Sequence, residues 1–581
     1  MLELLAKRAL ASEPGFTAKE VRWAIQFDSQ EGFTGLVELG KAGQKRNRGR
    51  LFPKCPDLTQ PELVSGPSPR SHFLVETASV VTLYKADADK KTAQKHKFFV
   101  YMLEEAGKTV PYLAKIAGFM KDGTVLEKIR KEMSRHKVRP TDKVTFGLDG
   151  EFPLEKDDWH EWWRSFRSGL ASTGSTTPQD ELFRCFVTGE LVVPTRTHPK
   201  IKDEKLAVVG GAASGDALIS CDKEAYCSYG LKQSFNAATS EKAARAYADA
   251  LKELIRENSK HLTGALVVYW FKEKVDPGDD PFPFLTDAPQ IRELNARERM
   301  RELLDGIETG KRPDLRGNRY YVMAMSGAGG RVMVRDWVEG DFSELVRNVN
   351  RWFDDLDIVL HDGRRSSPPR FIAVLEALSG DRDQLPAPLA SKLWRVAVRG
   401  EEFPYQVLAQ SAYRRRSEVL RGEDLNAIGM ALIKAYHLRK YRKEGSTLVE
   451  MLKPELSEDF PNVAYQCGRL LAALAELQRA ALGAVGAGVV KRYYAAASTT
   501  PALVLGRLIS NSQHHLNKLE SSSSPYARWY ENTIAEIVDR IKEPLPRTLT
   551  LEEQSLFALG YYHQLAAFRA GKKGNESKKE S

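Results

Sequence analysis

The chain has few cysteines and no long hydrophobic run. Five of its 581 residues are cysteine, and no two of them form a CxxC pair. An odd number of scattered thiols argues against a disulfide framework and indicates a reducing compartment. The most apolar helical stretch, near Leu470, is interrupted by Glu476, Gln478 and Arg479. No signal peptide is evident at the N-terminus either, so we expect a cytoplasmic protein without a membrane span.

Recognisable catalytic motifs are also missing. The sequence has no GxSxG, no GxGxxG and no glycine-rich loop ending in Lys followed by Ser or Thr. Cys221, Cys227 and His198 are too few and too widely spaced for a structural zinc site. Three carboxylates near His361 are interpreted as the end of an amphipathic helix rather than a two-metal site: Asp354, Asp355 and Asp357. We therefore expect no enzyme activity, no metal and no cofactor, and look for function in binding surfaces.

Length and pattern predict several domains of two kinds. A chain of 581 residues is too long for one hydrophobic core. Alternating segments at 21–27 and 32–39, and again at 319–325 and 331–337, predict antiparallel hairpins. Beyond residue 360 the strand signals stop. Helical spacing then recurs at 427–441, 462–482, 502–519, 526–541 and 551–568. The predicted fold class is an α+β N-terminal region with antiparallel hairpins, followed by an all-α C-terminal helical bundle.

Three regions follow from this pattern. We predict a mixed α+β region at 1–360, a helical basic connector at 361–455 and a C-terminal helical bundle at 456–581. In the first region an aromatic stripe at helical spacing is interpreted mainly as core, with base stacking as the alternative: Trp159, Trp162, Trp163 and Phe166.

The stretch from Cys185 to Asn236 is the strongest candidate for a binding site. It reads CFVTGE, THPKIK, GGAASG and CSYGLKQSFNA, with few long aliphatic side chains. Such loops can bring backbone N–H groups, hydroxyls, amides and amines close to a polyanion. The candidate contacts are Lys200, Lys202, Ser228, Lys232, Gln233 and Asn236. Glutamine and asparagine can pair with adenine, but polar packing within a loop is the open alternative.

Two further zones are strongly basic. The first is a loop with Lys45, Arg46, Arg48 and Arg50. The second lies on helices and combines cations with Tyr413, Tyr436 and Tyr441; its candidate contacts are Arg414, Arg415, Lys434, Arg439 and Lys440. Cations interleaved with tyrosine suit phosphates and stacked bases, whereas a merely solvated surface is the alternative. The excess of basic over acidic residues in the whole chain is modest. The chain has 87 Lys and Arg against 77 Asp and Glu, which gives a net charge of +10.

Several of these motifs occur in one order that resembles a known family. The motifs CFVTGE, HPKIK, SYG and a strand ending in YWF are followed by RYYVMAMSGAGGRVMVRDW, IKAYHLRKYR and LEEQSLFALGYYHQ. Together they resemble the large subunit of the type I-C CRISPR surveillance complex (Cascade), over nearly the whole chain. The sequence departs from the family pattern at Ser220-Cys221-Asp222 and at Met325-Ser326-Gly327-Ala328.

The resemblance implies a function. Such a subunit holds the 5′ handle of the guide RNA, recognises a protospacer-adjacent motif in duplex DNA and begins strand separation. Its C-terminal bundle supports the R-loop, which recruits a separate helicase–nuclease, and other Cascade subunits are its partners. An internal start at Met451 or Met430 would yield a separate small subunit. The alternatives are a nucleic-acid-processing enzyme with an unrecognised site and a purely structural scaffold subunit.

Overall fold

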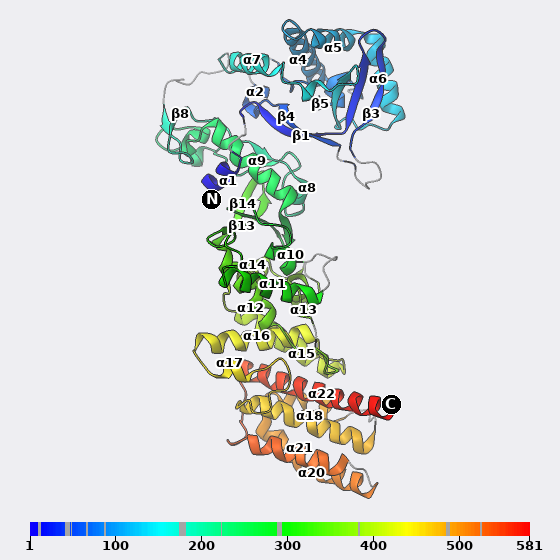
Figure 1. Ribbon diagram of the computed structural model, residues 1–581, viewed down its shortest axis with the longest axis vertical. Helices are drawn as coiled ribbons and strands as arrows, with labels where there is room; N and C mark the ends of the chain where they lie inside the picture. The colour runs from blue at the N-terminus through cyan, green and yellow to red at the C-terminus, as the bar shows by residue number, and fades with distance from the viewer. Residues whose placement is uncertain are drawn as a thin grey trace. The chain divides into compact units, whose positions relative to one another are not determined.

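The computed structural model describes the chain except residues 10–12, 41–46, 48, 65–67, 86–88, 173–181, 222, 287–292, 366, 382–383, 484–487, 523–525 and 581. The described residues form two compact units (Figure 1). The N-terminal unit comprises residues 1–257 and 326–333, and the C-terminal unit comprises 258–325 and 334–581. The three functional regions predicted from the sequence stay predictions, since compactness alone does not assign a function.

Short strands and helices alternate in the N-terminal unit. Its first elements are α1 (Leu2–Arg8), β1 (Phe16–Val21), β2 (Trp23–Asp28), β3 (Gly32–Glu38) and β4 (Arg50–Pro56). The strands β2 and β3 form the predicted hairpin, and their sheet has the order β3-β2-β6-β5, with β5 at Glu76–Thr77 and β6 at Lys143–Leu148. The β2–β6 pair is parallel, while β1 pairs with β4 in a separate antiparallel ribbon.

Helices complete this unit and bury its aromatic residues. They are α2 (Gln60–Val64), α3 (Ala78–Thr82), α4 (Lys90–Gly107), α5 (Pro111–Lys121), α6 (Gly123–Arg135), α7 (His160–Ser172), α8 (Glu204–Val208) and α9 (Glu241–Glu257). Trp159 and Trp163 are fully buried, and the Trp163 ring stacks on Phe73 with 5.8 Å between ring centroids. The core interpretation of the aromatic stripe is therefore confirmed for these two residues.

A buried ion cluster ties the β1–β4 ribbon to α9. Asp57 accepts from the Lys19 ammonium at 3.1 Å and from the Arg245 guanidinium at 2.8 Å. Burial opposes the negative charge of Asp57, but Lys19, His72 and Arg245 together hold its pKa well below its ordinary value. Asp57 therefore stays ionised, because a buried carboxylate is tolerated where cations compensate it.

The C-terminal unit begins with antiparallel strands and continues as helices. Its strands are β11 (Ser259–Leu262) and β12 (Ala265–Phe271), with most of β13 (Arg319–Ala328) and β14 (Arg331–Asp341), which form the second predicted hairpin. The helices preceding the bundle are α10 (Pro281–Thr286), α11 (Glu293–Glu308), α12 (Phe342–Asp355), α13 (Phe371–Ser379), α14 (Ala387–Arg399), α15 (Tyr405–Arg421), α16 (Ala427–Lys443) and α17 (Leu448–Met451).

A helical bundle follows, which confirms the predicted fold class. Its members are α18 (Val463–Leu482), α19 (Val489–Ala497), α20 (Pro501–Ser521), α21 (Tyr526–Arg540) and α22 (Leu551–Glu580). Helix α18 packs against each of the other four. Its residues 464–474 are buried without interruption, as expected for a central helix. No helix among the described residues has the length and apolar character needed to cross a bilayer.

The basic helix predicted at 427–441 is a core helix rather than a charged surface. On α16 the side chains of Lys434 and Arg439 are buried, with 1% and 3% of their surface exposed. Arg439 donates through Nε to Asp355 at 2.8 Å, and Arg442 donates to the same carboxylate at 2.9 Å. Both interpretations of the charge pattern, nucleic-acid contacts and a solvated face, require exposed cations, but here Asp355 at the end of α12 compensates buried cations inside the protein.

We expect Arg439→Met to lower the free energy of unfolding by about 3–5 kcal/mol, because the substitution removes a cationic partner of the buried Asp355 carboxylate. The double variant Asp355→Leu/Arg439→Met should recover part of this loss. Lys443→Met is the control, since its ion pair with Glu402 is exposed to solvent and should contribute little to stability. Denaturant unfolding of the full chain measures all three, and equal losses for Arg439→Met and Lys443→Met would contradict the buried-pair interpretation.

Buried histidines make the C-terminal unit sensitive to acid. Burial lowers the pKa of His437 to about 4 and that of His563 to about 3, and both rings are hydrogen-bonded, to Ser555 at 2.8 Å and Tyr465 at 2.9 Å. Their neutral forms stabilise the fold fully above the unfolded pKa of about 6.5. As pH falls below that value the unfolded chain binds more protons, so stability decreases by about 1.4 kcal/mol per pH unit for each histidine.

We therefore expect His437→Gln, which retains a hydrogen-bonding side chain, to reduce the slope of unfolding free energy against pH between about 6 and 4. Denaturant unfolding at several pH values measures this slope. An unchanged slope in the variant would show that His437 does not bind an extra proton on unfolding.

Candidate nucleic-acid interface

Residues 182–221, 223–240 and 326–333 of the N-terminal unit form what we call the loop cluster. Its first part is a two-stranded ribbon, β7 (Phe183–Arg184) with β8 (Leu191–Val192). Phe186 donates through its backbone N–H to Ala238 at 3.0 Å, and Thr195 donates likewise to Thr239 at 2.9 Å. Segments more than forty residues apart are thus joined by backbone hydrogen bonds, so this part of the loop cluster is held in one conformation.

The two lysines of the HPKIK motif are exposed, as a binding role requires. The strands β9 (Lys200–Ile201) and β10 (Asp216–Ala217) are antiparallel, and Ala217 lies next to Arg331 at the start of β14. Ile201 is fully buried, whereas Lys200 and Lys202 on either side of it are exposed. Alternation along the strand therefore anchors the backbone and directs both ammonium groups to solvent.

The two glycine-rich turns of the sequence pack against each other. Gly327 donates its backbone N–H to Val209 at 3.0 Å, and a Cβ at Gly327 would overlap the backbone of Gly211. A Cβ at Gly210 would lie 2.8 Å from the carbonyl oxygen of Gly327. The glycines are needed for this close approach of two backbones.

The SYGLKQSFNA segment contains the remaining candidate contacts. Ser228, Lys232 and Gln233 are exposed, whereas Asn236 is half-buried. The Asn236 amide accepts from the Ser228 N–H at 3.0 Å and donates to the carbonyls of Leu231 at 2.7 Å and Gln233 at 3.3 Å. Residue type predicts Asn236 to be a base-reading amide, with polar packing within the loop as the alternative; these three bonds brace the loop and favour the alternative.

Two tyrosines, Tyr229 in this segment and Tyr226 just before it, were not among the predicted contacts. The Arg331 guanidinium lies 4.7 Å above the Tyr226 ring and donates to the Tyr226 hydroxyl at 2.7 Å. Tyr229 is exposed to 101% and has a positive φ of 54°. The dipeptide Tyr229-Gly230 indicates a turn, but nothing in the sequence distinguishes a solvent-exposed tyrosine from a buried one.

His198 belongs to the core of the loop cluster. Its Nδ1 lies 2.6 Å from the Tyr247 hydroxyl on α9, and burial lowers its pKa to about 4. The ring is therefore neutral near pH 7 and supports the turn that carries Lys200. Among the residues that the structure describes, no three His, Cys, Asp or Glu side chains gather where they could share a metal ion.

The basic loop of the N-terminal unit is described only in part. Lys45, Arg46 and Arg48 lie outside the described residues. Arg50, on β4, pairs with Glu155, and its guanidinium lies 5.0 Å from the Phe52 ring and 5.3 Å from the Phe152 ring. Arg50 is thus held between a carboxylate and two aromatic rings, which reduces the net charge that it presents.

The second basic zone is mostly structural. Arg415 is 2% exposed, pairs with Glu418, and fills space that a side chain at Gly429 would occupy. Burial lowers the pKa of Lys434 to about 8, although Asp355 and Asp357 raise it. Arg415, Lys434 and Arg439 were predicted as nucleic-acid contacts. The structure corrects this, because a buried cation cannot reach a phosphate. Arg414 is half-buried on α15, and Lys440 pairs with Glu552 at 2.6 Å.

The three carboxylates considered for metal chemistry are held in ion pairs. Asp354 accepts from Arg297 at 2.7 Å, and Asp357 accepts from Arg297 at 3.0 Å and from Arg365 at 3.1 Å. Together with the Asp355–Arg439 pair, these contacts fix the end of α12 against α11 and α16. They agree with the interpretation of these residues as a helix end.

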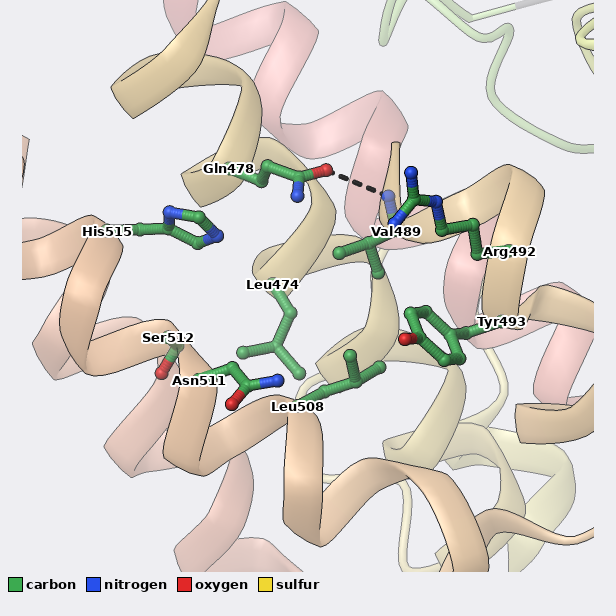
Figure 2. Close-up of a pocket in the computed structure, with 9 residues that line it drawn as sticks. All are labelled: Leu474, Gln478, Val489, Arg492, Tyr493, Leu508, Asn511, Ser512 and His515. Atoms are coloured by element: carbon green, nitrogen blue, oxygen red, sulfur yellow. Dashed lines mark hydrogen bonds between the residues drawn. The ribbon is translucent and has the colours of Figure 1, made fainter. Parts of the chain in front are cut away.

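The C-terminal bundle contains a small cavity of about 160 Å³ between α18, α19 and α20. Leu474, Val489 and Leu508 line its interior, and polar groups including Gln478, Arg492 and His515 surround them (Figure 2). Gln478 accepts from the Val489 N–H at 2.8 Å, which ties α18 to the start of α19. The volume of this cavity is below the roughly 300–1,000 Å³ typical of cofactor sites.

We expect Gly327→Ala to loosen the loop cluster, at a cost of about 1–3 kcal/mol, because the new methyl group meets backbone atoms that cannot rotate away. Limited proteolysis of the full chain should then cut residues 205–235 faster. The control is Gly118→Ala on α5, where nothing lies within 4 Å of the added methyl group and a small gain of stability is expected. Equal cleavage rates in both variants would contradict the proposed contact between the turns.

The chain matches a known protein family over most of its length. The family model of CRISPR-associated protein (Cas_Csd1) matches residues 3–569, which is nearly the whole chain. A search of curated proteins gives no match. The family match agrees with the resemblance drawn from the order of the motifs, several of which lie in the loop cluster. The chain therefore belongs to the Csd1 family of CRISPR-associated proteins, the large-subunit family of the type I-C Cascade.

Proposed function

We propose that the loop cluster recognises the protospacer-adjacent motif in duplex DNA and helps to open the duplex. The observation that carries this proposal is the arrangement of exposed Lys200, Lys202, Lys232 and Gln233 on backbone braced from several directions. Lysines contribute sequence-independent attraction to phosphates, and an exposed amide can reach base edges. Rigid presentation limits the conformational entropy lost on binding.

The energetics of an RNA-guided complex suit such a subunit. Exchanging a DNA duplex for an RNA–DNA duplex is nearly balanced, so modest protein contacts decide whether opening begins. Binding and deforming DNA requires no bond-breaking chemistry, in keeping with a non-catalytic subunit of Cascade. Lys45, Arg46 and Arg48 remain in the proposal as phosphate contacts. Arg50, Arg414 and Lys440 remain as secondary ones, because Arg50 and Lys440 already have carboxylate partners.

The same proposal assigns the remaining partners. The guide RNA handle and the other Cascade subunits would contact this chain, and the completed R-loop would recruit a separate helicase–nuclease. The C-terminal bundle would support the R-loop. An internal start at Met451 would leave α18–α22 intact, whereas a start at Met430 would fall inside α16.

Replacing Lys200, Lys202 and Lys232 by alanine should weaken binding of the assembled complex to all duplexes. The slope of log affinity against log salt concentration should flatten by about 0.9 for each phosphate that the variant no longer neutralises. Titration at several salt concentrations with motif-bearing duplex measures this slope. An unchanged slope would exclude phosphate contacts by these lysines and favour a scaffold that touches only protein.

Gln233→Gly provides the matched comparison, since glycine accepts the positive φ of 53° at this position and removes only the amide side chain. It should leave the salt slope unchanged and reduce the preference for motif over non-motif duplex by about 1–3 kcal/mol. Equal losses on both duplexes would contradict base reading by Gln233. Cleavage of DNA by the chain alone would instead favour the enzyme alternative.

A further inference from the structure

Tyr229 is held in an unusual backbone conformation at the tip of a tight turn. The Leu231 N–H donates to the Ser228 carbonyl at 2.9 Å, which closes the turn. Both central residues have positive φ, 54° at Tyr229 and 75° at Gly230, the pattern of a type I′ turn. Glycine adopts this conformation freely, but for a tyrosine it is strained. Strain of this kind persists only where the surroundings fix the backbone.

The Asn236 side chain supplies that constraint. One amide accepts from the N–H of Ser228 and donates to the carbonyl of Leu231, so it holds both ends of the turn at once. The short helix that carries Asn236, η3 (Gln233–Ala237), is itself attached through Ser234, whose N–H donates to Arg196 at 3.3 Å. The Tyr229 ring is therefore presented on a rigid base, and its 101% exposure means that no described neighbour covers it.

The surroundings of the turn are suited to a polyanion. Lys223 and Lys232 are exposed on either side of it, and residues 225–240 contain no Asp or Glu, although Asp222 and Glu224 precede them in the sequence. The Arg331 guanidinium lies 4.7 Å over the Tyr226 ring, which is 43% exposed, whereas the Tyr229 ring has both faces open. An open aromatic face among cations suits a nucleobase on its phosphate backbone better than an apolar protein surface.

We propose that Tyr229 is a stacking wedge for an unpaired base of the target duplex. This inference rests on the proposed function and assigns a residue to its strand-opening step. When the first base pair beside the recognised motif opens, the ring stacks on the base left at the duplex end. Stacking of a base on an aromatic side chain contributes about 1–3 kcal/mol, against about 1.4 kcal/mol for an average DNA stacking step. One tyrosine can thus replace the base stacking that the first opening step removes.

The test uses the assembled, guide-loaded complex and compares closed duplex with a duplex that carries a mismatched bubble beside the motif. Tyr229→Asn removes the ring and keeps a residue that tolerates positive φ. It should slow R-loop formation on closed duplex by about 5- to 150-fold, the range equivalent to 1–3 kcal/mol. On the bubbled duplex the loss should disappear, because no stacking step has to be replaced. Tyr229→Phe should retain the wild-type rate, since stacking does not need the hydroxyl.

Tyr405→Ala is the matched control, because this tyrosine is 53% exposed at the start of α15 and lies outside the loop cluster. It should open closed duplex at the wild-type rate. Equal losses on closed and bubbled duplex would overturn the wedge, as would a Tyr229→Asn complex that opens closed duplex normally. Failure of this variant to join the other subunits would assign Tyr229 to a protein contact and overturn it too. In each of these cases the salt dependence of the lysine variants tests the proposed function separately.

Discussion

Two buried carboxylates of this protein each keep cations beside them, and these ion pairs take up basic residues that would otherwise lie at the surface. In the N-terminal unit Asp57 holds Lys19 and Arg245. In the C-terminal unit Asp355 holds Arg439 and Arg442. These pairs join elements far apart in sequence, so each contributes to the packing around it. The net charge of +10 therefore does not indicate where a binding surface lies, because many of the Lys and Arg side chains already have carboxylate partners.

The cations of the loop cluster are in a different situation. Lys200 and Lys202 flank the buried Ile201 on a short strand, and the strand leaves both ammonium groups exposed. Backbone hydrogen bonds, the Asn236 amide and the contact between two glycine-rich turns hold the surrounding loops. The loop cluster thus combines exposed charge with a fixed backbone. A subunit that must distinguish a short motif needs both, since charge attracts every duplex and only fixed geometry discriminates between them.

Much of the fold could be predicted from local pattern. The hairpins β2–β3 and β13–β14 and the bundle helices α18, α20, α21 and α22 follow from periodicity and turn residues. The residues of the candidate site were harder to predict from the sequence. The exposed lysines and Gln233 followed from residue type, but Asn236 proved to be a brace, and Arg415, Lys434 and Arg439 proved to be buried. Residue type gives the chemistry that a side chain can perform, whereas its partner depends on segments far away in the chain.

The sequence by itself determined the classes of element, the family and the stretch that carries the candidate binding residues, because periodicity, motif order and composition are local properties. The tertiary structure alone decided which cations are buried and that the Tyr229 ring is fully exposed to solvent. Both depend on long-range contacts: Arg439 lies 84 residues from Asp355, and Tyr226 lies 105 residues from the Arg331 that lies over its ring. Tyr229, three residues further on, remains open, since its turn is closed by its own segment and faces solvent.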